Sequence, residues 1–367
     1  MTTPALASQI TTELFDLANN ENPWGPSPAV IEAIQRTAAQ AHHYPDTTGL
    51  PLREALAEHY HLDANQLMLG NGSNELIDLV ARQWATPGAE VIVPSPSFLP
   101  YGSCAIRSGA KVIRTGLSNW QFDLGAALEM ISDKTSLVIL ANPNNPTGRQ
   151  LEREALEQWL SAIPEHILVV LDEAYAEYSG DQALGLRLIT QRENLLVLRT
   201  FSKAYALAGL RIGYAMGQPK TIAKLQGQRQ QYHVNRTAQA AAMAALMDQE
   251  HLNRNLQNNL ICRQKLCAGL RDLGIGHLPS MTNFILLHCG RSSAAAEALQ
   301  LYGMMVKPLE RFGLHEFIRV SIGRPETIEQ LLIALKDIQH KQPWFPVAEN
   351  TAIAPPQPNS GEKLWRS

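Results

Sequence analysis

The sequence predicts an α/β protein with a mainly parallel central sheet, helices on both faces of that sheet, and a second, smaller α/β domain. Short apolar runs without polar alternation are typical of strands that are covered on both faces. Helical segments such as 75–84 and 152–160 lie between these runs, which is the order expected of a parallel sheet. The predicted strands of this part are residues 90–93, 111–114, 137–140, 167–171 and 195–198.

The pattern changes after about residue 217, where the chain becomes helical and rich in Ala, Gln and Asn. Residues 283–287 and 317–322 then predict strands of the smaller domain. Five prolines between 343 and 358 predict a tail without regular structure. We therefore divide the chain into residues 1–44 (an N-terminal arm and part of the small domain), 45–255 (the large domain), 256–341 (the small C-terminal domain) and 342–367 (the Pro-rich tail).

Composition narrows the class of protein. The chain has 367 residues, of which 45% are hydrophobic and 18% charged, as in globular proteins. A formal net charge of -3 argues against nucleic acid as the main partner, because binding to phosphates needs a basic excess. The four cysteines form no Cys-x-x-Cys pair, which predicts reduced thiols in a cytoplasmic protein. We expect no signal peptide in residues 1–10, no membrane span, and no metal site among the eleven histidines.

Chemically versatile residues follow three of the predicted strands. Asn142–Gly148 comes after the strand at 137, Asp172–Tyr175 closes the strand at 167, and Thr200–Lys203 follows the strand at 195. The carboxyl ends of parallel strands meet at one edge of a sheet, where ligands bind. We therefore expect one crevice that collects an amide, a carboxylate, a phenol, hydroxyls and an amine.

This set of groups suits pyridoxal phosphate (PLP). A lysine amine can form a Schiff base with its aldehyde, and a carboxylate can keep its pyridine nitrogen protonated. Hydroxyls, an arginine and the N–H groups of a helix start can bind its phosphate. Gly70–Asn74, just before the helix at residue 75, combines flexible glycines with capping side chains. Each motif alone is common in turns and on surfaces, and their joint occurrence in this order indicates a PLP site.

These motifs, together with Gly209–Tyr214, Asn20–Pro26 and Tyr44–Asp46, resemble those of the fold-type I PLP-dependent aminotransferases. The branch that they resemble most is the histidinol-phosphate aminotransferase family, and the resemblance runs from about residue 19 to residue 341. It implies a homodimer with shared active sites. It also implies transfer of an amino group between histidinol phosphate and 2-oxoglutarate, a step of histidine biosynthesis.

The resemblance also implies roles for individual residues. Lys203 would form the Schiff base and shuttle a proton, Asp172 would pair with the pyridine nitrogen, and Tyr175 would contact the phenolic oxygen of the ring. Further implied cofactor contacts are Asn145 at the phenolic oxygen, Phe98 stacked on the ring, Gly72, Ser73, Asn74, Thr200, Ser202 and Arg211 at the phosphate, and Tyr44 at the phosphate of the partner subunit. Implied substrate contacts are Arg319 for a carboxylate, Lys307 for a phosphate, and Asn22 and Trp24 in the substrate pocket.

One position departs from the family's pattern. Many histidinol-phosphate aminotransferases carry Arg where this chain has Lys307, and Lys lacks the bidentate fork of Arg. An aminotransferase for aromatic or other amino acids is therefore an alternative, and so is a PLP-dependent decarboxylase of a phosphorylated amino acid. A PLP-sensing regulator would need a DNA-binding module, for which the chain ahead of Asn20 offers no room.

Overall fold

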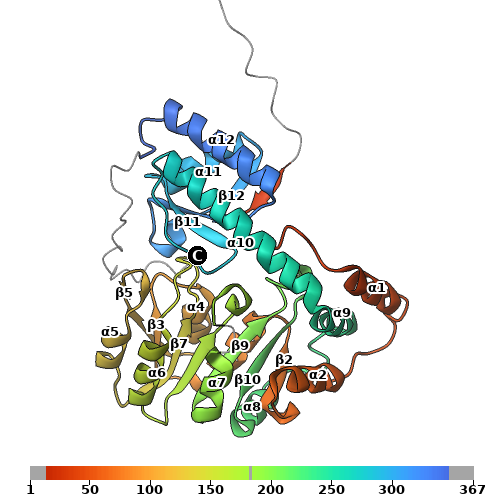
Figure 1. Ribbon diagram of the computed structural model, residues 1–367. Helices are drawn as coiled ribbons and strands as arrows, with labels where there is room; N and C mark the ends of the chain where they lie inside the picture. The colour runs from red at the N-terminus through yellow and green to blue at the C-terminus, as the bar shows by residue number, and fades with distance from the viewer. Residues whose placement is uncertain (1–13, 182–183, 347–367) are drawn as a thin grey trace, which may run out of the picture.

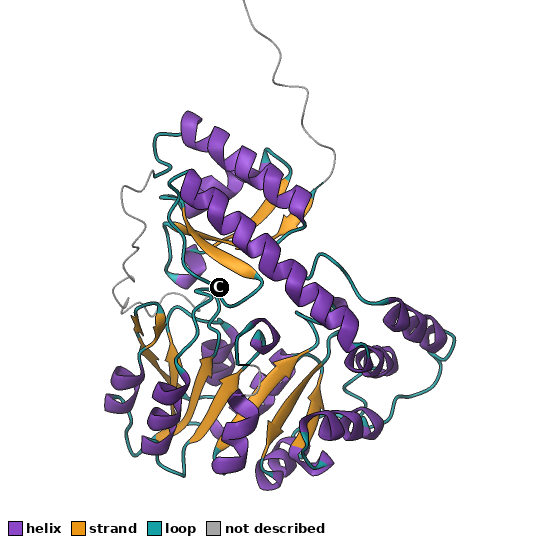
Figure 2. Cartoon of the chain, viewed as in Figure 1, coloured by secondary structure: helices purple, strands orange, loops and turns teal. Residues whose placement is uncertain are grey.

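The computed structural model describes residues 14–181 and 184–346, and its centre is a seven-stranded sheet (Figures 1 and 2). The strand order is β2-β10-β9-β8-β7-β3-β4, in which β10 is antiparallel to both of its neighbours and the other pairs are parallel. The five predicted strands are confirmed with small shifts at their ends. The bounds are β2 (Leu67–Gly70), β3 (Glu90–Pro94), β4 (Lys111–Thr115), β7 (Thr135–Ala141), β8 (Leu168–Asp172), β9 (Leu195–Thr200) and β10 (Gly213–Gly217).

Both faces of this sheet are covered by helices. Along β7, Val138 and Leu140 belong to one buried cluster, whereas Leu137 and Ile139 belong to another on the opposite face. The predicted α/β architecture is therefore confirmed. The first cluster includes residues of α1 (Pro28–Ala38), α2 (Leu50–Tyr60), α5 (Leu124–Glu129), α6 (Arg153–Ala162), α7 (Leu184–Gln191) and α9 (Arg236–Met247), and the second includes residues of α3 (Ser73–Trp84), α4 (Pro100–Arg107) and α8 (Pro219–Gln226).

A second sheet of four strands lies above the carboxyl ends of the first (Figure 1). Its helices pack on one face, against Ile318 and Val320. Because neighbouring residues of a strand point to opposite faces, Arg319 points the other way, toward the large sheet. The strands, in spatial order, are β1 (Phe15–Leu17), β12 (Met304–Pro308), β13 (Phe317–Ser321) and β11 (Phe284–His288), and the helices are α10 (Gln249–Asp272), α11 (Ser292–Gln300) and α12 (Pro325–Lys341).

Our proposed division of the chain can be placed on the two sheets. Strand β1 pairs with β12, so the N-terminal arm contributes to the small sheet. The proposed boundary after residue 255 falls inside α10, a single helix that reaches from one part to the other (Figure 1). In the tail, Phe345 is buried against the small-domain core, and residues from 347 onward lie outside the described residues.

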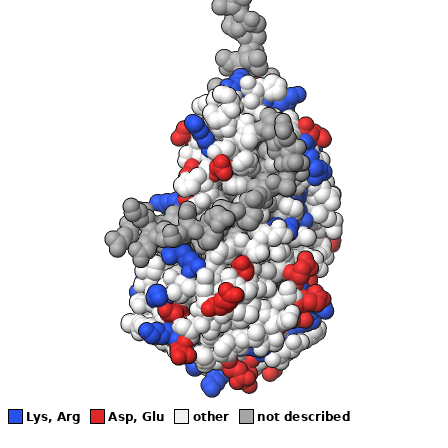
Figure 3. All heavy atoms as spheres, turned by 90° about the vertical axis from the view of Figure 1, so that its left-hand side faces the viewer, with Lys and Arg blue, Asp and Glu red and all other residues white. Residues whose placement is uncertain are grey.

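Two further expectations concern leaders and membranes. Residues 1–10, for which we expect no signal peptide, lie outside the described residues. Among the helices of the described ranges, none has the length and apolar character that crossing a membrane would require. On the face drawn in Figure 3, basic and acidic side chains are interspersed rather than gathered into one basic surface.

Candidate active site

A cavity of about 840 Å³ lies between the carboxyl ends of β7, β8 and β9 and the strands β12 and β13 of the small sheet. The position agrees with the rule that ligands bind beyond the carboxyl ends of parallel strands. The structure brings twelve of the predicted site residues to its walls: Ser73, Asn74, Phe98, Asn145, Asp172, Tyr175, Thr200, Ser202, Lys203, Arg211, Lys307 and Arg319.

Lys203 follows β9 and extends its amine into this cavity, where Nζ donates a hydrogen bond to the carbonyl oxygen of Asn19 at 2.9 Å. Burial is the main cause, and the positive charge of Arg319 the second, that lower the pKa of Lys203 from 10.5 to about 8. A larger fraction of the amine is therefore neutral near physiological pH than in an ordinary lysine. A neutral amine is the form that attacks a carbonyl carbon.

Asp172 ends β8 and is only 4% exposed. Its Oδ1 accepts a hydrogen bond from the backbone N–H of Ala174 at 3.0 Å, and its Oδ2 accepts one from the hydroxyl of Tyr101 at 2.7 Å. Burial raises the pKa of Asp172 to about 6, and both hydrogen bonds oppose that rise. The carboxylate is thus mainly ionised at neutral pH and suited to face a cationic group.

Arg319 joins the small sheet to the end of β7. Its Nη1 donates to Asn145 Oδ1 at 2.6 Å, and its Nη2 donates to the carbonyl oxygen of Ala18 at 2.6 Å. The side chain is 6% exposed, and its Nε has no hydrogen-bond partner among the described residues. Nearby, the Tyr175 hydroxyl accepts a hydrogen bond from Asn20 Nδ2 at 2.9 Å. Burial raises the pKa of Tyr175, while the charge of Arg319 opposes this, so the phenol is protonated at neutral pH.

Hydroxyls, a guanidinium and a helix start form a cradle on one side of the cavity. The Thr200 hydroxyl donates to Ser202 Oγ at 3.0 Å, and Arg211 Nη1 lies 3.4 Å from the same Oγ. Gly72 caps α3 with a φ of +77°, and a Cβ built there would lie 2.5 Å from Arg211 Nη2. Only glycine fits this position. Ser73 is the first residue of α3, whose leading N–H groups have no partner within the helix and attract anions.

The residues present therefore fit PLP. The cradle offers hydroxyls, a guanidinium and helix N–H groups to a phosphate, with glycine where the chain must approach closely. The amine of Lys203 suits the aldehyde, and the carboxylate of Asp172 suits the pyridine nitrogen.

The small sheet adds a second group of charges. Lys307 and Arg319 are direct partners in the antiparallel pair of β12 and β13, so both side chains lie on the same face. Like charges directly opposite each other are unfavourable. An anionic ligand between the two side chains could pair with both. Glu310 and Arg311, just beyond β12, also line the cavity.

Four predicted site residues are not among those that line the cavity. Gly72 lies behind it, against Arg211. Tyr44 is 76% exposed and stacks on Tyr232, with ring centroids 4.5 Å apart. Asn22 donates to the carbonyl oxygen of Ala204 at 3.0 Å and accepts from the Trp24 N–H at 3.0 Å, and Trp24 packs against the small-domain core.

Several cavity residues were not selected from the sequence. Tyr101 and Arg311 belong to no motif, because an aromatic residue in a helix and a charge in a turn look like ordinary packing and surface residues. Asn20 and Glu21 begin the motif Asn20–Pro26, and membership of that motif is a signal that could have identified them as cavity residues.

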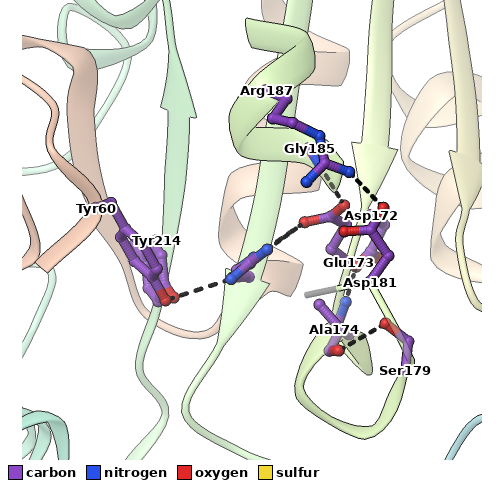
Figure 4. A network of polar contacts seen from close by, with 11 residues as sticks. Tyr60, Asp172, Glu173, Ala174, Ser179, Asp181, Gly185, Arg187 and Tyr214 are labelled. Carbon is purple, nitrogen blue, oxygen red and sulfur yellow. Dashed lines mark hydrogen bonds and ion pairs between the residues drawn. The ribbon is translucent and has the colours of Figure 1, made fainter. Parts of the chain in front are cut away.

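A buried ion pair lies next to the end of β8 (Figure 4). Arg199 Nη2 and Glu173 Oε2 are 2.8 Å apart, and their side chains are 3% and 2% exposed. The other oxygen of Glu173 accepts the backbone N–H of Gly185 at 2.9 Å, and Arg199 Nη1 donates to the Tyr60 hydroxyl at 3.4 Å. Since Glu173 follows Asp172 and Arg199 precedes Thr200, this network ties together the two strand ends that carry site residues.

Comparison with known proteins shows the family to which this fold belongs. Residues 12–335 match the model of the aminotransferase class I and II family, and the chain belongs to that family. Within it, the chain belongs to the histidinol-phosphate aminotransferases. It is 42% identical to histidinol-phosphate aminotransferase 2 of Pseudomonas fluorescens, over 89% of each chain. It is 39% identical to the histidinol-phosphate aminotransferase of Symbiobacterium thermophilum, over 88% of this chain and 90% of the relative.

A solved structure gives the same result. The histidinol-phosphate aminotransferase of Sinorhizobium meliloti, in complex with pyridoxal-5'-phosphate, is similar with a TM-score of 0.83 and 30% identity. The similarity covers 90% of this chain and 91% of that one. The resemblance inferred from the motifs is therefore confirmed for the family and the fold.

Proposed function

We propose that this chain is a PLP-dependent aminotransferase that transfers the amino group of histidinol phosphate to 2-oxoglutarate, as a cytoplasmic enzyme of histidine biosynthesis. The observation that carries the proposal is the convergence of Lys203, Asp172 and the cradle around Arg211 on one cavity. PLP, when bound, supplies a protonated ring that accepts the electrons released at the substrate's Cα. The names of its relatives and the cofactor of the solved neighbour support the proposal.

The chain's own residues have distinct tasks in this proposal. Lys203, with its lowered pKa, holds the cofactor covalently and moves a proton at the substrate's Cα. Asp172, ionised above pH about 6, holds the proton at the ring nitrogen. Tyr175 and Asn145 contact the phenolic oxygen, and Phe98 packs on the ring. The phosphate would be held by Ser73, Asn74, Thr200, Ser202 and Arg211, with Gly72 allowing the close approach of Arg211 to the start of α3.

The substrate would meet the cationic wall of the small sheet. Arg319 binds the carboxylate of glutamate, because its buried Nε–H lacks a partner among the described residues. Lys307, directly opposite on β12, binds the phosphate of histidinol phosphate. Each anion would thus meet a cationic side chain on the same face of the small sheet. Asn22 and Trp24 complete the pocket indirectly, since Asn22 holds the backbone just after Lys203.

We also propose a homodimer with shared active sites. Tyr44 is exposed and is not among the residues that line the cavity of its own chain. An exposed aromatic residue of this kind suits a contact with a second copy. In the dimer, Tyr44 would reach the cofactor phosphate of the partner subunit.

A panel of amino donors tests the proposed reaction. Purified protein loaded with PLP is mixed with 2-oxoglutarate and either histidinol phosphate, phenylalanine, tyrosine or a phosphorylated amino acid, and glutamate and carbon dioxide are measured. We expect glutamate to form fastest from histidinol phosphate, without carbon dioxide. Faster glutamate formation from phenylalanine or tyrosine would contradict histidinol phosphate as the amino donor. Release of carbon dioxide would indicate a decarboxylase instead of an aminotransferase.

A further inference from the structure

Tyr101 is a buried residue of the cavity wall that no motif singled out. It lies in the first turn of α4, lines the cavity and is only 1% exposed. Its hydroxyl donates to Asp172 Oδ2 at 2.7 Å, across 71 positions of sequence. A phenol that is buried this deeply and aimed at a single carboxylate oxygen does more than fill space.

The hydrogen bonds around Asp172 fix the plane of its carboxylate. Tyr101 donates to Oδ2, and the backbone N–H of Ala174 donates to Oδ1. Each oxygen therefore has one donor, and none of the ion pairs within the described residues includes Asp172. With both oxygens held, the remaining lone pairs can point in only a narrow range of directions.

The phenol is suited to remain a donor. Burial raises the pKa of Tyr101 well above its usual value, and the negative charge of Asp172 raises it further. The hydroxyl therefore stays protonated wherever the carboxylate is ionised. A hydrogen bond to an ionised acceptor is stronger than one between neutral groups.

Tyr101 also contacts Phe98, the residue predicted to stack on the cofactor ring. Its ring meets Phe98 edge to face, with centroids 5.6 Å apart and planes inclined by 77°. In the proposed function, Phe98 packs on the face of the cofactor ring and Asp172 meets the nitrogen at its edge. One side chain thus touches both residues that would define where the ring lies.

We propose that Tyr101 is a positioning residue, whose hydroxyl holds the Asp172 carboxylate in the orientation that meets the pyridine nitrogen of the cofactor. The inference rests on the proposed function, because it needs PLP in the cavity. It predicts a specific loss: without the hydroxyl, the chain recognises the ring nitrogen less well. Recognition of the phosphate and the aldehyde, by groups on other elements, remains.

The test compares two cofactors in one variant. Apoprotein is titrated with PLP and with its 1-deaza analogue, in which carbon replaces the ring nitrogen, and both Kd values are measured by fluorescence. We expect Tyr101→Phe to reduce the preference for PLP over the analogue by about tenfold to a hundredfold, the range for a hydrogen bond to a charged group. The preference is the ratio of the two Kd values measured in the same variant. A general loosening of the fold weakens the binding of both cofactors equally and leaves this ratio unchanged.

Tyr302→Phe is the matched control, since the Tyr302 hydroxyl also donates to a carboxylate, that of Asp337, outside the cavity. It should leave the preference unchanged. Should Tyr101→Phe not fold, Tyr101→Met provides the same test with a flexible apolar side chain. In the Asp172→Asn background, Tyr101→Phe should change the preference little further.

The outcomes separate the two proposals. Wild-type protein that does not bind PLP contradicts the proposed function itself. Wild-type protein that prefers PLP, with an unchanged preference in Tyr101→Phe, overturns only the inference about Tyr101. An equal loss of affinity for both cofactors would also overturn it, because that result means a merely structural role.

Discussion

Removing the charge of Arg319 should slow the covalent attachment of PLP to Lys203. Attachment needs the neutral amine, and the pKa of Lys203 is about 8, compared with 10.5 for an ordinary lysine. At pH 7, the neutral fraction is therefore roughly one in ten, instead of roughly one in three thousand. Arg319 is the second cause of this lowering after burial. In Arg319→Gln the charged amine loses a repulsive neighbour, so its pKa rises and less of it is neutral.

The size of the effect follows from the same figures. Burial, the larger cause, remains in the variant, so only part of the lowering is lost. We expect attachment at pH 7 to slow by about threefold to tenfold, since one pKa unit changes the neutral fraction tenfold. Above pH about 10, where most of the amine is neutral in either protein, the two rates should converge.

The assay needs no substrate, so the role of Arg319 in substrate binding does not enter. Apoprotein is mixed with PLP in a stopped-flow instrument, and the absorbance of the bound cofactor is followed between pH 6 and 10. Glu21→Gln should act in the opposite direction, because the charge of Glu21 raises the pKa of Lys203. Lys307→Gln is the control, a cation of the same cavity that is not among the charges acting on Lys203. Equal pH profiles for Arg319→Gln and Lys307→Gln would refute the reasoning.

Four further predictions concern the site and its support. Asp172→Asn should retain PLP but lose most activity, and near-normal half-reaction rates in stopped flow would make Asp172 structural. Lys307→Ala should raise the KM for histidinol phosphate by roughly tenfold to a hundredfold, because a charged hydrogen bond to the phosphate is lost. The KM for glutamate should rise much less, and steady-state kinetics with both donors measure the two values. Mixing inactive Tyr44→Ala and Lys203→Ala subunits should restore activity in hybrids with one intact site, and no recovery despite proven subunit exchange contradicts sharing. Glu173→Gln removes the charge of one of the two carboxylates that act on the buried Arg199 guanidinium, while Glu177 remains. It should lower the free energy of unfolding by about 1–3 kcal/mol, measured by denaturant titration, and an unchanged value would mean that the pair contributes little.

The sequence predicted the parallel part of the large sheet well, because its signals are local. A run such as Val138–Leu140 is apolar at every position, and only a strand covered on both faces needs that pattern. Strands β2 and β10 were missed. Strand β2 has only four residues. Strand β10 begins with Gly213 and ends with Gly217, so its composition does not mark it as a strand.

The site was predictable where it follows strand ends and was not predictable where it depends on tertiary contacts. Asp172 ends one recognisable strand and Lys203 lies three residues beyond another, so their convergence follows from the parallel sheet. Tyr101 reaches Asp172 from a helix 71 positions earlier, and its sequence neighbourhood gives no indication of that partner. The pairing of Lys307 with Arg319 depends on the register of β12 and β13. A slip of one residue in that register would place the two side chains on opposite faces of the sheet.

The charges of the cavity connect these observations. Its walls carry more cationic than acidic side chains, and Arg319 lies close enough to Lys203 to lower its pKa. The same guanidinium has a free Nε–H within the described chain, which an anionic substrate group can accept. An anion bound at Arg319 offsets its positive charge, so the pKa of Lys203 rises toward its ordinary value. In the apoprotein, such an anion should therefore slow the attachment of PLP to Lys203, in the same direction as Arg319→Gln. Arg319 thus links the binding of an anion in the cavity to the protonation state of the free Lys203 amine.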